Sequence, residues 1–285
     1  MTARTNRWKV RVFLGLAIVL LLAAILAKWL VPYDPYEQDL SQSLQSPSIQ
    51  HWMGTDQYGR DMFSRVLMGA RASLSMTLLL VAVIAVFGTA VGILCGYKGG
   101  KVDAIVMRIS DVFLAFPGLV FAIAIAGILG GGMQNAVLSL AVISWPKYAR
   151  IARGQVLLVK EMPYVAAARL SHTGTGKIIL RHILPNSMDM VLITAMLDIG
   201  TMMMELAGLS YLGLGAAPPM AEWGSMMSTG RSMLQTAPWV ILAPGAAIFC
   251  TVAIFNLLGD SIRDVLEPGQ AESAELGEEV LHQPK

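Results

Sequence analysis

Long uncharged stretches are the feature of this sequence that most restricts its fold. Val12 to Val31 is interrupted only by Lys28, and the ranges 72–97 and 112–146 contain no Asp, Glu, Lys or Arg. Twenty helical residues rise about 30 Å, which matches the hydrocarbon thickness of a bilayer. Because lipid offers the backbone no hydrogen-bond partner, each stretch is expected to form a helix. With 55% hydrophobic and 14% charged residues, the chain is predicted to be an integral membrane protein.

Breaks between the apolar stretches predict about six membrane-spanning helices. Gly130, Gly131 and Gly132 indicate a turn that divides the range 112–146 into a third and a fourth helix. The fifth is expected at 190–212 and the sixth at 239–259. The first, at 12–31, is long for a signal peptide and no small-residue cleavage pattern follows it, so we expect it to stay uncleaved. The predicted fold class is an all-α membrane protein.

The distribution of basic residues predicts the orientation. With the N-terminus inside, 16 of the 21 Lys and Arg residues fall on the cytoplasmic side and 5 on the external side. Cytoplasmic loops are enriched in Lys and Arg, and an even number of spans places both termini on one side. The sequence therefore predicts an N-in, C-in topology. The net charge is only +2 and forms no continuous basic face, so nucleic-acid binding is not expected.

The range 147–186 is polar enough to leave the membrane but is too organised for a plain linker. Ala166, Ala167, Ala168, Arg169 and Leu170 favour a helix, and the breakers Gly174 and Gly176 follow. A second segment runs from Lys177 to Ile183, before Pro185. A short helix of small residues could lie in a groove of a partner protein. The alternative is a loop that only connects two spans.

Three sets of residues together resemble one transporter family. The range 164–186, which ends His182, Ile183, Leu184, Pro185 and Asn186, is similar to the coupling loop of permease subunits of ATP-binding-cassette (ABC) importers. The external and C-terminal motifs are similar to the dipeptide, oligopeptide and nickel branch: Gly54, Thr55, Asp56, Gly59, Arg60, Asp61, Ser64, Arg65, then Leu212, Gly213, Leu214, Gly215, and Glu222, Trp223, Gly224. The resemblance covers residues 9–268.

The resemblance implies a complex in the plasma (inner) membrane. Its members would be a second permease subunit, two cytoplasmic ATPase subunits and an external solute-binding protein. ATP and magnesium would be bound by the ATPase subunits, and no cofactor is expected on this chain. The range 166–170 and Gly174 would couple to the ATPases, whose closure would push this helix and tilt the spans. The chain lacks a Gly-x-x-x-x-Gly-Lys motif, so we expect it not to hydrolyse ATP.

On this basis the chain is expected to have five parts. These are a cytoplasmic N-terminus (1–11), the first transmembrane helix (12–31), an external segment (32–71), a transmembrane permease core (72–267) that includes the cytoplasmic coupling loop (147–186), and a disordered cytoplasmic tail (268–285). Met62, Phe63, Val66 and Leu67 suggest a short interfacial helix in the external segment.

Two positions of the loop depart from the family pattern. Ala166 stands where a Glu is usual, and His172 stands where a Gly is usual. Docking is therefore expected without the salt bridge that the Glu could form. Two other groups of residues look more like the nickel-type members than the dipeptide-type ones: Arg169, Leu170, Ser171, Thr173, Gly174, and Leu197, Asp198, Ile199, Gly200, Met202, Met203. Nickel or a metal chelate is therefore the expected cargo, and a di- or oligopeptide is the alternative.

Ionisable residues inside a predicted span are candidates for the substrate path. Asp198, Met202 and Glu205 share one face of the fifth helix by their i, i+4, i+7 spacing. A charge at a helix centre disfavours insertion by about 2.5–3.5 kcal/mol, so such groups usually face a pore or a partner. Carboxylates suit a cation, and thioethers are soft ligands. The alternative is that the acids bond to a neighbouring helix and that Met fills space.

Asp56, Arg60, Asp61 and Arg65 have opposite charges at i, i+4 spacing, which would stabilise a short external helix. They could also form an external gate or dock the binding protein. Glu222 and Trp223 allow the same two interpretations, with Trp223 as an interfacial anchor. No His pair has metal-ligand spacing, so no metal site is predicted on this chain. Two other classes of function are less well supported. A membrane-embedded enzyme would need catalytic motifs, which the sequence lacks. A passive channel or ion-driven carrier would not need the organised cytoplasmic loop.

Overall fold

The computed structural model describes residues 2–266, and over this range the chain is helical without a β-strand; its one isolated bridge joins Thr55 and Asp61. The α-helices are α1 (Thr2–Leu30), α2 (Met62–Lys98), α3 (Gly100–Ala115), α4 (Gly118–Ile128), α5 (Met133–Val159), α6 (Pro163–Leu170), α7 (Thr175–Ile178), α8 (Leu184–Tyr211), α9 (Trp223–Gly230) and α10 (Trp239–Leu266). Shorter turns are η1 (Leu40–Gln42), the π-helical η2 (Ile179–Ile183) and η3 (Arg231–Met233). The expected disordered tail, 268–285, lies outside the described residues.

Several helices are long and apolar enough to cross a membrane. Among the described residues these are most of α1, the whole of α2, most of α10 and the continuous stretch from α7 to α8, which makes four. The count rises to five if α3 and α4, bent by 93° at a short break, form one span. The all-α membrane fold is confirmed. The second half of α5 carries Lys147, Arg150 and Arg153, and α5 is not among these helices.

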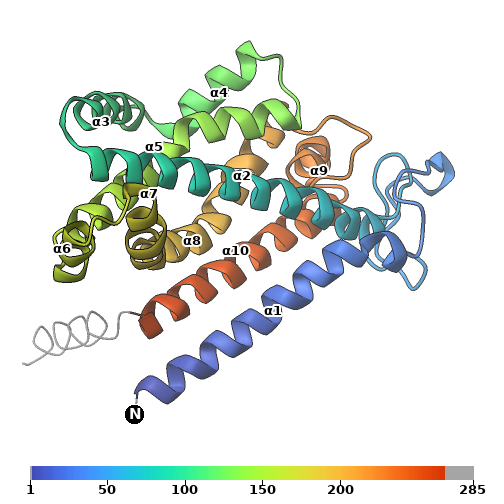
Figure 1. Ribbon diagram of the computed structural model, residues 1–285. Coiled ribbons are helices and arrows are strands. Elements are labelled where there is room, and N and C mark those ends of the chain that lie inside the picture. Colours follow the sequence, from blue (N-terminus) through green and yellow to red (C-terminus); the bar gives the residue numbers. More distant parts are fainter. Residues whose placement is uncertain (1, 267–285) are drawn as a thin grey trace, which may run out of the picture.

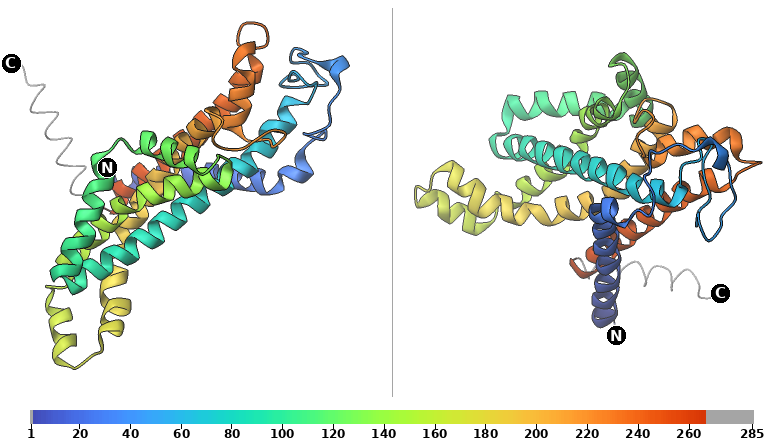
Figure 2. Two further views of the ribbon diagram at one scale, coloured as in Figure 1. Left: turned by 90° about the horizontal axis from the view of Figure 1, so that it is seen from above. Right: turned by 90° about the vertical axis from the view of Figure 1, so that its right-hand side faces the viewer.

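The long helices form one bundle with a different structure at each end. α2 packs along α5, α8 along α10, and α1 against α10 and α2. Figure 1 shows the loop between α1 and α2 at one end of the bundle and α6 and α7 at the other, and the view from above in Figure 2 agrees. The loop after α1 and the α6–α7 segment are therefore far apart.

Close contact between α2 and α5 depends on three glycines at four-residue intervals. A Cβ at Gly92 would lie 2.3 Å from the carbonyl oxygen of Ala149, and one at Gly88 would lie 2.5 Å from that of Trp145. At Gly96 it would lie 2.9 Å from Cβ of Val156. Small residues let membrane helices approach closely and gain dispersion energy where no hydrophobic force drives association.

The predicted turn at Gly130–Gly132 is confirmed, because α4 ends at Ile128 and α5 begins at Met133. All three glycines have positive φ, at 83°, 71° and 93°, which residues with a Cβ rarely adopt.

Three expected boundaries differ from the structure. The separate interfacial helix near Met62 is instead the start of α2, where Asp61 caps the helix by accepting a hydrogen bond from the Ser64 N–H at 2.7 Å. At 37 residues, α2 is about 55 Å long and exceeds the bilayer core. α5 continues to Val159, through the first third of the predicted cytoplasmic loop, and α1 already begins at Thr2.

Candidate functional site

The end of the bundle opposite the α1–α2 loop presents a short helix with an exposed face. Pro163 occupies the first turn of α6, where its missing N–H has no cost. Ala166, Ala167, Arg169 and Leu170 are exposed, and Leu170 is 81% exposed. The predicted helix, turn and second helix are therefore present, with the small residues on the outside.

A small hydrophobic core of its own attaches this helix to the bundle. Val165, on the inner face of α6, is fully buried, and Ala168 packs against the same core. The other buried members come from α2, α5, α7 and η2: Ile93, Val156, Val159, Ile178 and Ile183. The guanidinium of Arg169 also lies over the ring of Tyr97, 5.9 Å from its centroid. Movement of α6 is thereby linked to the adjacent ends of α2 and α5.

The turn after α6 contains His172, one of the two departures from the family pattern. His172 has φ of 53°, in the left-handed region that favours glycine. The turn is closed by hydrogen bonds from the N–H of His172 to the carbonyl of Arg169 and from the N–H of Thr173 to that of Ala168, at 3.0 and 3.1 Å. Gly174, by contrast, has φ of −58°, and a Cβ at this position would have no atom within 4 Å. The conformation that favours a glycine is therefore at residue 172, where His172 adopts it.

Asp198 lies near the middle of α8 and is buried, at 2% exposure. Its Oδ1 accepts a hydrogen bond from Nζ of Lys147 on α5 at 2.5 Å. Its Oδ2 has no hydrogen-bond partner among the described residues, although the hydroxyl of Tyr148 lies close enough to interact. Asp198 therefore faces α5 and binds a cation of the chain itself.

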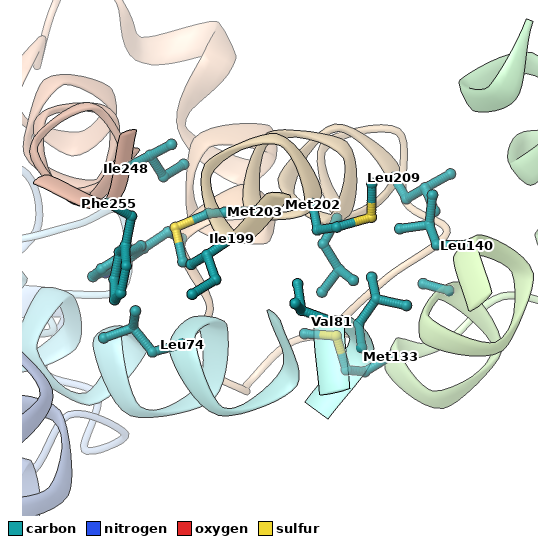
Figure 3. Packing of buried hydrophobic residues seen from close by; sticks show 14 of the residues in the cluster. Leu74, Val81, Met133, Leu140, Ile199, Met202, Met203, Leu209, Ile248 and Phe255 are labelled. Atoms are coloured by element: carbon teal, nitrogen blue, oxygen red, sulfur yellow. The ribbon is translucent and has the colours of Figure 1, made fainter. Parts of the chain in front are cut away.

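The other two predicted path residues have different surroundings. Met202 is buried at 6% exposure and belongs, with Met203, to the main apolar core, as Figure 3 shows. Glu205 is half-buried and lies seven residues, about two helical turns, beyond Asp198 on the same face of α8. The structure thus pairs Asp198 with a cation and leaves Glu205 partly exposed, while Met202 contacts apolar side chains.

Sequence reasoning missed Lys147, which it assigned to the cytoplasmic loop. The signal was present in the helical spacing of the buried residues Tyr148, Ala149, Ala152, Val156 and Val159, which continues one face of α5 beyond Pro146.

The predicted external residues form a buried network rather than a surface helix. Asp56 accepts hydrogen bonds from the backbone N–H and Nε of Arg60, the latter at 2.7 Å, and lies 3.5 Å from Nε of Arg65. Asp61 accepts one from His51 Nδ1 at 2.9 Å while it caps α2. All five side chains are less than 10% exposed. The i, i+4 pair Asp56–Arg60 thus forms within a turn, and the expected Asp61–Arg65 pair is replaced by the contact of Arg65 with Asp56.

The outer face of this network surrounds an open hollow of about 380 Å³. Carboxylates of Asp34, Glu37, Asp39 and Asp61 line it. Hydrogen bonds from the hydroxyl and then the backbone N–H of Ser41 lower the pKa of Asp39 from its ordinary value. The hollow therefore gathers four acidic side chains.

Glu222 and Trp223 are both buried, at 1% and 2% exposure. Glu222 caps α9 by accepting hydrogen bonds from the N–H groups of Gly224 and Ser225, and it also accepts one from the hydroxyl of Ser73 on α2 at 3.1 Å. Trp223 donates its indole N–H to the carbonyl of Val66 at 2.8 Å. Trp223 is therefore not the interfacial anchor suggested above, because its ring packs inside the bundle.

Side chains that commonly bind metals do not gather into a site within residues 2–266. No group of three or more His, Cys, Asp or Glu side chains there could hold a metal ion.

Comparison with protein families gives two matches. Residues 88–272 match the family described as the binding-protein-dependent transport system inner membrane component. Residues 10–47 match the N-terminal transmembrane domain of oligopeptide transport permease C.

Relatives with curated names span several cargoes. The chain is 45% identical to the glutathione transport system permease protein of Pectobacterium atrosepticum, over 93% of this chain and 89% of that protein. It is 43% identical to the dipeptide transport system permease protein of Alkalihalophilus pseudofirmus, over 89% and 84%. Identity to the nickel transport system permease protein of Escherichia coli is 39%, over 93% and 95%. Identity therefore does not favour the nickel member.

Solved structures support the fold alone. An inward-facing structure of the MetNI methionine ABC transporter matches with a TM-score of 0.58 at 21% identity, over 72% of this chain and 97% of that chain.

Proposed function

The chain belongs to the family of binding-protein-dependent ABC importer permeases that includes the peptide and nickel transporters, and from this membership we propose how it works in the inner membrane. In this proposal it forms one half of the solute path beside a second permease. Two cytoplasmic ATPase subunits bind ATP and magnesium and drive the cycle. An external binding protein delivers the solute. This chain itself needs no cofactor.

The observation that carries the coupling role is the exposed face of α6 above its own small core. The exposed face of α6 presents the small side chains of Ala166 and Ala167 near its middle and the apolar side chain of Leu170 at its end. The buried Val165 gives the same helix a rigid connection to α2 and α5. A push on α6 would therefore be transmitted to the bundle as a shift between two discrete packings.

The proposed topology has six crossings with both termini in the cytoplasm. α1, α2, the bent α3–α4 pair, α5, α8 and α10 would make these crossings. The basic residues support this orientation, because α6, α7 and η2 carry Arg169, Lys177 and Arg181 on the side where Lys and Arg accumulate. The network at the end of α1 would then face the binding protein, and its acidic hollow is a candidate contact.

The proposed cargo is a small solute of the kinds that the relatives carry, either a short peptide or nickel. Nickel or a metal chelate was the expectation from sequence, with a di- or oligopeptide as the alternative, and the named relatives are glutathione, dipeptide and nickel permeases.

Uptake by the whole transporter tests these proposals. Cells without their own peptide and nickel uptake would express all subunits, with or without this chain, and receive radioactive nickel or a radiolabelled dipeptide. Uptake of one cargo that requires both this chain and ATP is the expected result. Uptake that persists without ATPase activity would overturn the assignment and favour a passive channel. The Glu205→Ala variant tests the path, since loss of uptake at normal abundance is expected.

A further inference from the structure

Three basic residues lie along one side of α5 at three-residue intervals, each paired with an acid of another helix. Lys147 pairs with Asp198 on α8, Arg150 with Asp111 on α3, and Arg153 with Asp103 on α3. Arg150 and Arg153 lie toward the α6 end of α5, whereas Lys147 lies near its middle. Lys147 is therefore the basic residue of this row that is deepest in the bundle.

The Lys147 pair is strongly asymmetric. The side chain of Asp198 is 3% exposed and that of Lys147 is 50% exposed. In the proposed topology Lys147 lies near the middle of the α5 crossing, and a cation at that depth lines a water-filled path or meets a partner instead of facing lipid. This topology therefore puts the exposed part of Lys147 on the path or on the subunit interface that encloses it.

Glu205 supplies an opposite charge on the same face of α8. It lies seven residues beyond Asp198, about 10 Å along the helix axis, and it is only half-buried. The hydrogen bonds and ion pairs within residues 2–266 do not include its carboxylate. Because Asp198 meets Lys147, the exposed part of the Lys147 cation and the partly exposed Glu205 carboxylate lie along the same contact between α5 and α8, separated by about the length of a short peptide.

We propose that Lys147 and Glu205 form a recognition site for a zwitterionic solute, a short peptide with free termini. Lys147 binds the solute carboxylate and Glu205 binds its ammonium group. Asp198 stays buried and fixes the Lys147 side chain in place. The inference rests on the proposed permease function and decides between its two cargo classes.

Charge argues against free nickel at the same place. A divalent cation would approach two carboxylates only by also approaching the Lys147 ammonium, which repels it. No third His, Cys, Asp or Glu completes a metal site with them in the described part of the chain. A zwitterion satisfies both charges at once.

The test compares three forms of one solute in the whole reconstituted transporter. Radiolabelled alanyl-alanine, its C-terminal amide and its N-acetyl derivative separate the two charges. Lys147→Gln is expected to raise KM for the free dipeptide about tenfold, the size of one charge-assisted hydrogen bond, and to change KM for the amide little. Glu205→Gln should raise KM for the free dipeptide and the amide, but not for the N-acetyl form. Lys147→Arg should preserve selectivity, and Lys101→Gln, an exposed charge on α3, is the matched control.

A charge exchange separates recognition from a structural latch. Lys147→Asp with Asp198→Lys restores an ion pair but removes the exposed cation, so the raised KM for the free dipeptide should remain. Restoration of wild-type KM in this variant, or an equal rise for all three solutes in Lys147→Gln, would overturn the inference. If the wild-type transporter takes up nickel but no dipeptide, the recognition site is overturned and the permease function stands. If it takes up neither cargo in an ATP-dependent way, the recognition site and the permease function are both overturned.

Discussion

Lys147 on α5 and Asp198 on α8 form an ion pair of 2.5 Å between Nζ and Oδ1, and only one partner reaches the surface of the chain. Asp198 is enclosed, and its Oδ2 has no hydrogen-bond partner in the described residues. Lys147 is therefore the cation that pairs with the enclosed Asp198 carboxylate, while Lys147 itself has access to the surface. This asymmetry makes the two single substitutions unequal.

Lys147→Met is expected to destabilise the subunit more than Asp198→Asn. The first leaves a buried carboxylate unpaired, whereas the second leaves a half-exposed ammonium beside a neutral amide. We expect about 1–3 kcal/mol for Lys147→Met, after allowance for screening at the exposed partner, and under about 1 kcal/mol for Asp198→Asn. Thermal unfolding in detergent, followed by loss of the monodisperse species, measures both.

The double variant is the control for this prediction. Lys147→Met with Asp198→Asn should recover most of the lost stability, because no unpaired charge remains. A larger loss for Asp198→Asn alone would show that the buried carboxylate does not depend on Lys147.

Gly92→Leu is expected to separate α2 from α5. Even a Cβ at this position would lie 2.3 Å from the Ala149 carbonyl, and a backbone atom cannot rotate away as a side chain can. Overpacking of this kind typically destabilises by about 1–3 kcal/mol, and a larger side chain forces the helices further apart. Unfolding in detergent should occur at lower temperature. Gly15→Leu on α1, where a Cβ meets nothing within 4 Å, is the matched control and should be nearly neutral.

Local sequence patterns predicted the apolar helices, the turn at Gly130–Gly132 and the helical segments after Met162. Charges were harder to interpret, because a single sequence does not show what neutralises them. Lys147 was read as the exit from the membrane, but Asp198, 51 residues later, pairs with it inside the bundle. Arg65 was expected to pair with Asp61 in a short external helix, but its partners are Asp56 and the Pro35 carbonyl. Pairing between residues far apart in the sequence therefore decides the surroundings of these charges.

The surroundings of Trp223 and Met202 also depend on other helices. Trp occurs at membrane surfaces and Met in pores, and only the packing of other helices shows that these two side chains are enclosed within the chain. Asp198 and Glu205 are unusual residues for a span, which a single sequence can show. The pairing of Asp198 with Lys147 is not visible in the sequence, since nothing local relates α5 to α8.

Glu222→Ala is expected to destabilise the junction of α9 with α2. The substitution leaves the N–H groups of Gly224 and Ser225 and the Ser73 hydroxyl without their acceptor, and buried unsatisfied groups are unfavourable by about 1–3 kcal/mol each. Glu222→Gln retains one carbonyl acceptor and should lose less. Thermal unfolding measures the order, with Glu37→Ala as the exposed control. Equal stability of Glu222→Ala and wild type would show that the cap is not required.

His172→Gly is expected to stabilise the turn after α6. A residue with a Cβ in the left-handed region is unfavourable by about 1–2 kcal/mol, and glycine avoids this at a smaller entropic loss. The net gain should be about 0.5–1 kcal/mol. The rate of trypsin cleavage at Arg169 and Lys177 in the purified transporter reports local opening and should fall. Gly174→Ala, at a φ that any residue adopts, should change the rate little; faster cleavage in His172→Gly would contradict the assignment of strain to residue 172.

Ala167→Glu is expected to uncouple transport from ATP hydrolysis without unfolding the subunit. Ala167 is exposed on α6, so a longer charged side chain meets no atom of this chain but would hold α6 away from a closely fitting partner. Uptake should fall at least about tenfold, since a misfit of 1.4 kcal/mol suffices for that change, while thermal stability stays within about 0.5 kcal/mol. Val165→Ala, by contrast, should lower the thermal stability, because it opens a cavity in the small core and loosens α6 from the bundle. Ser46→Glu, at an exposed position of the loop between α1 and α2, controls for added surface charge. If Ala167→Glu transports like wild type and retains its ATPase subunits in purification, α6 is not the docking helix. A closely fitting groove of the ATPase would not accept the longer charged side chain.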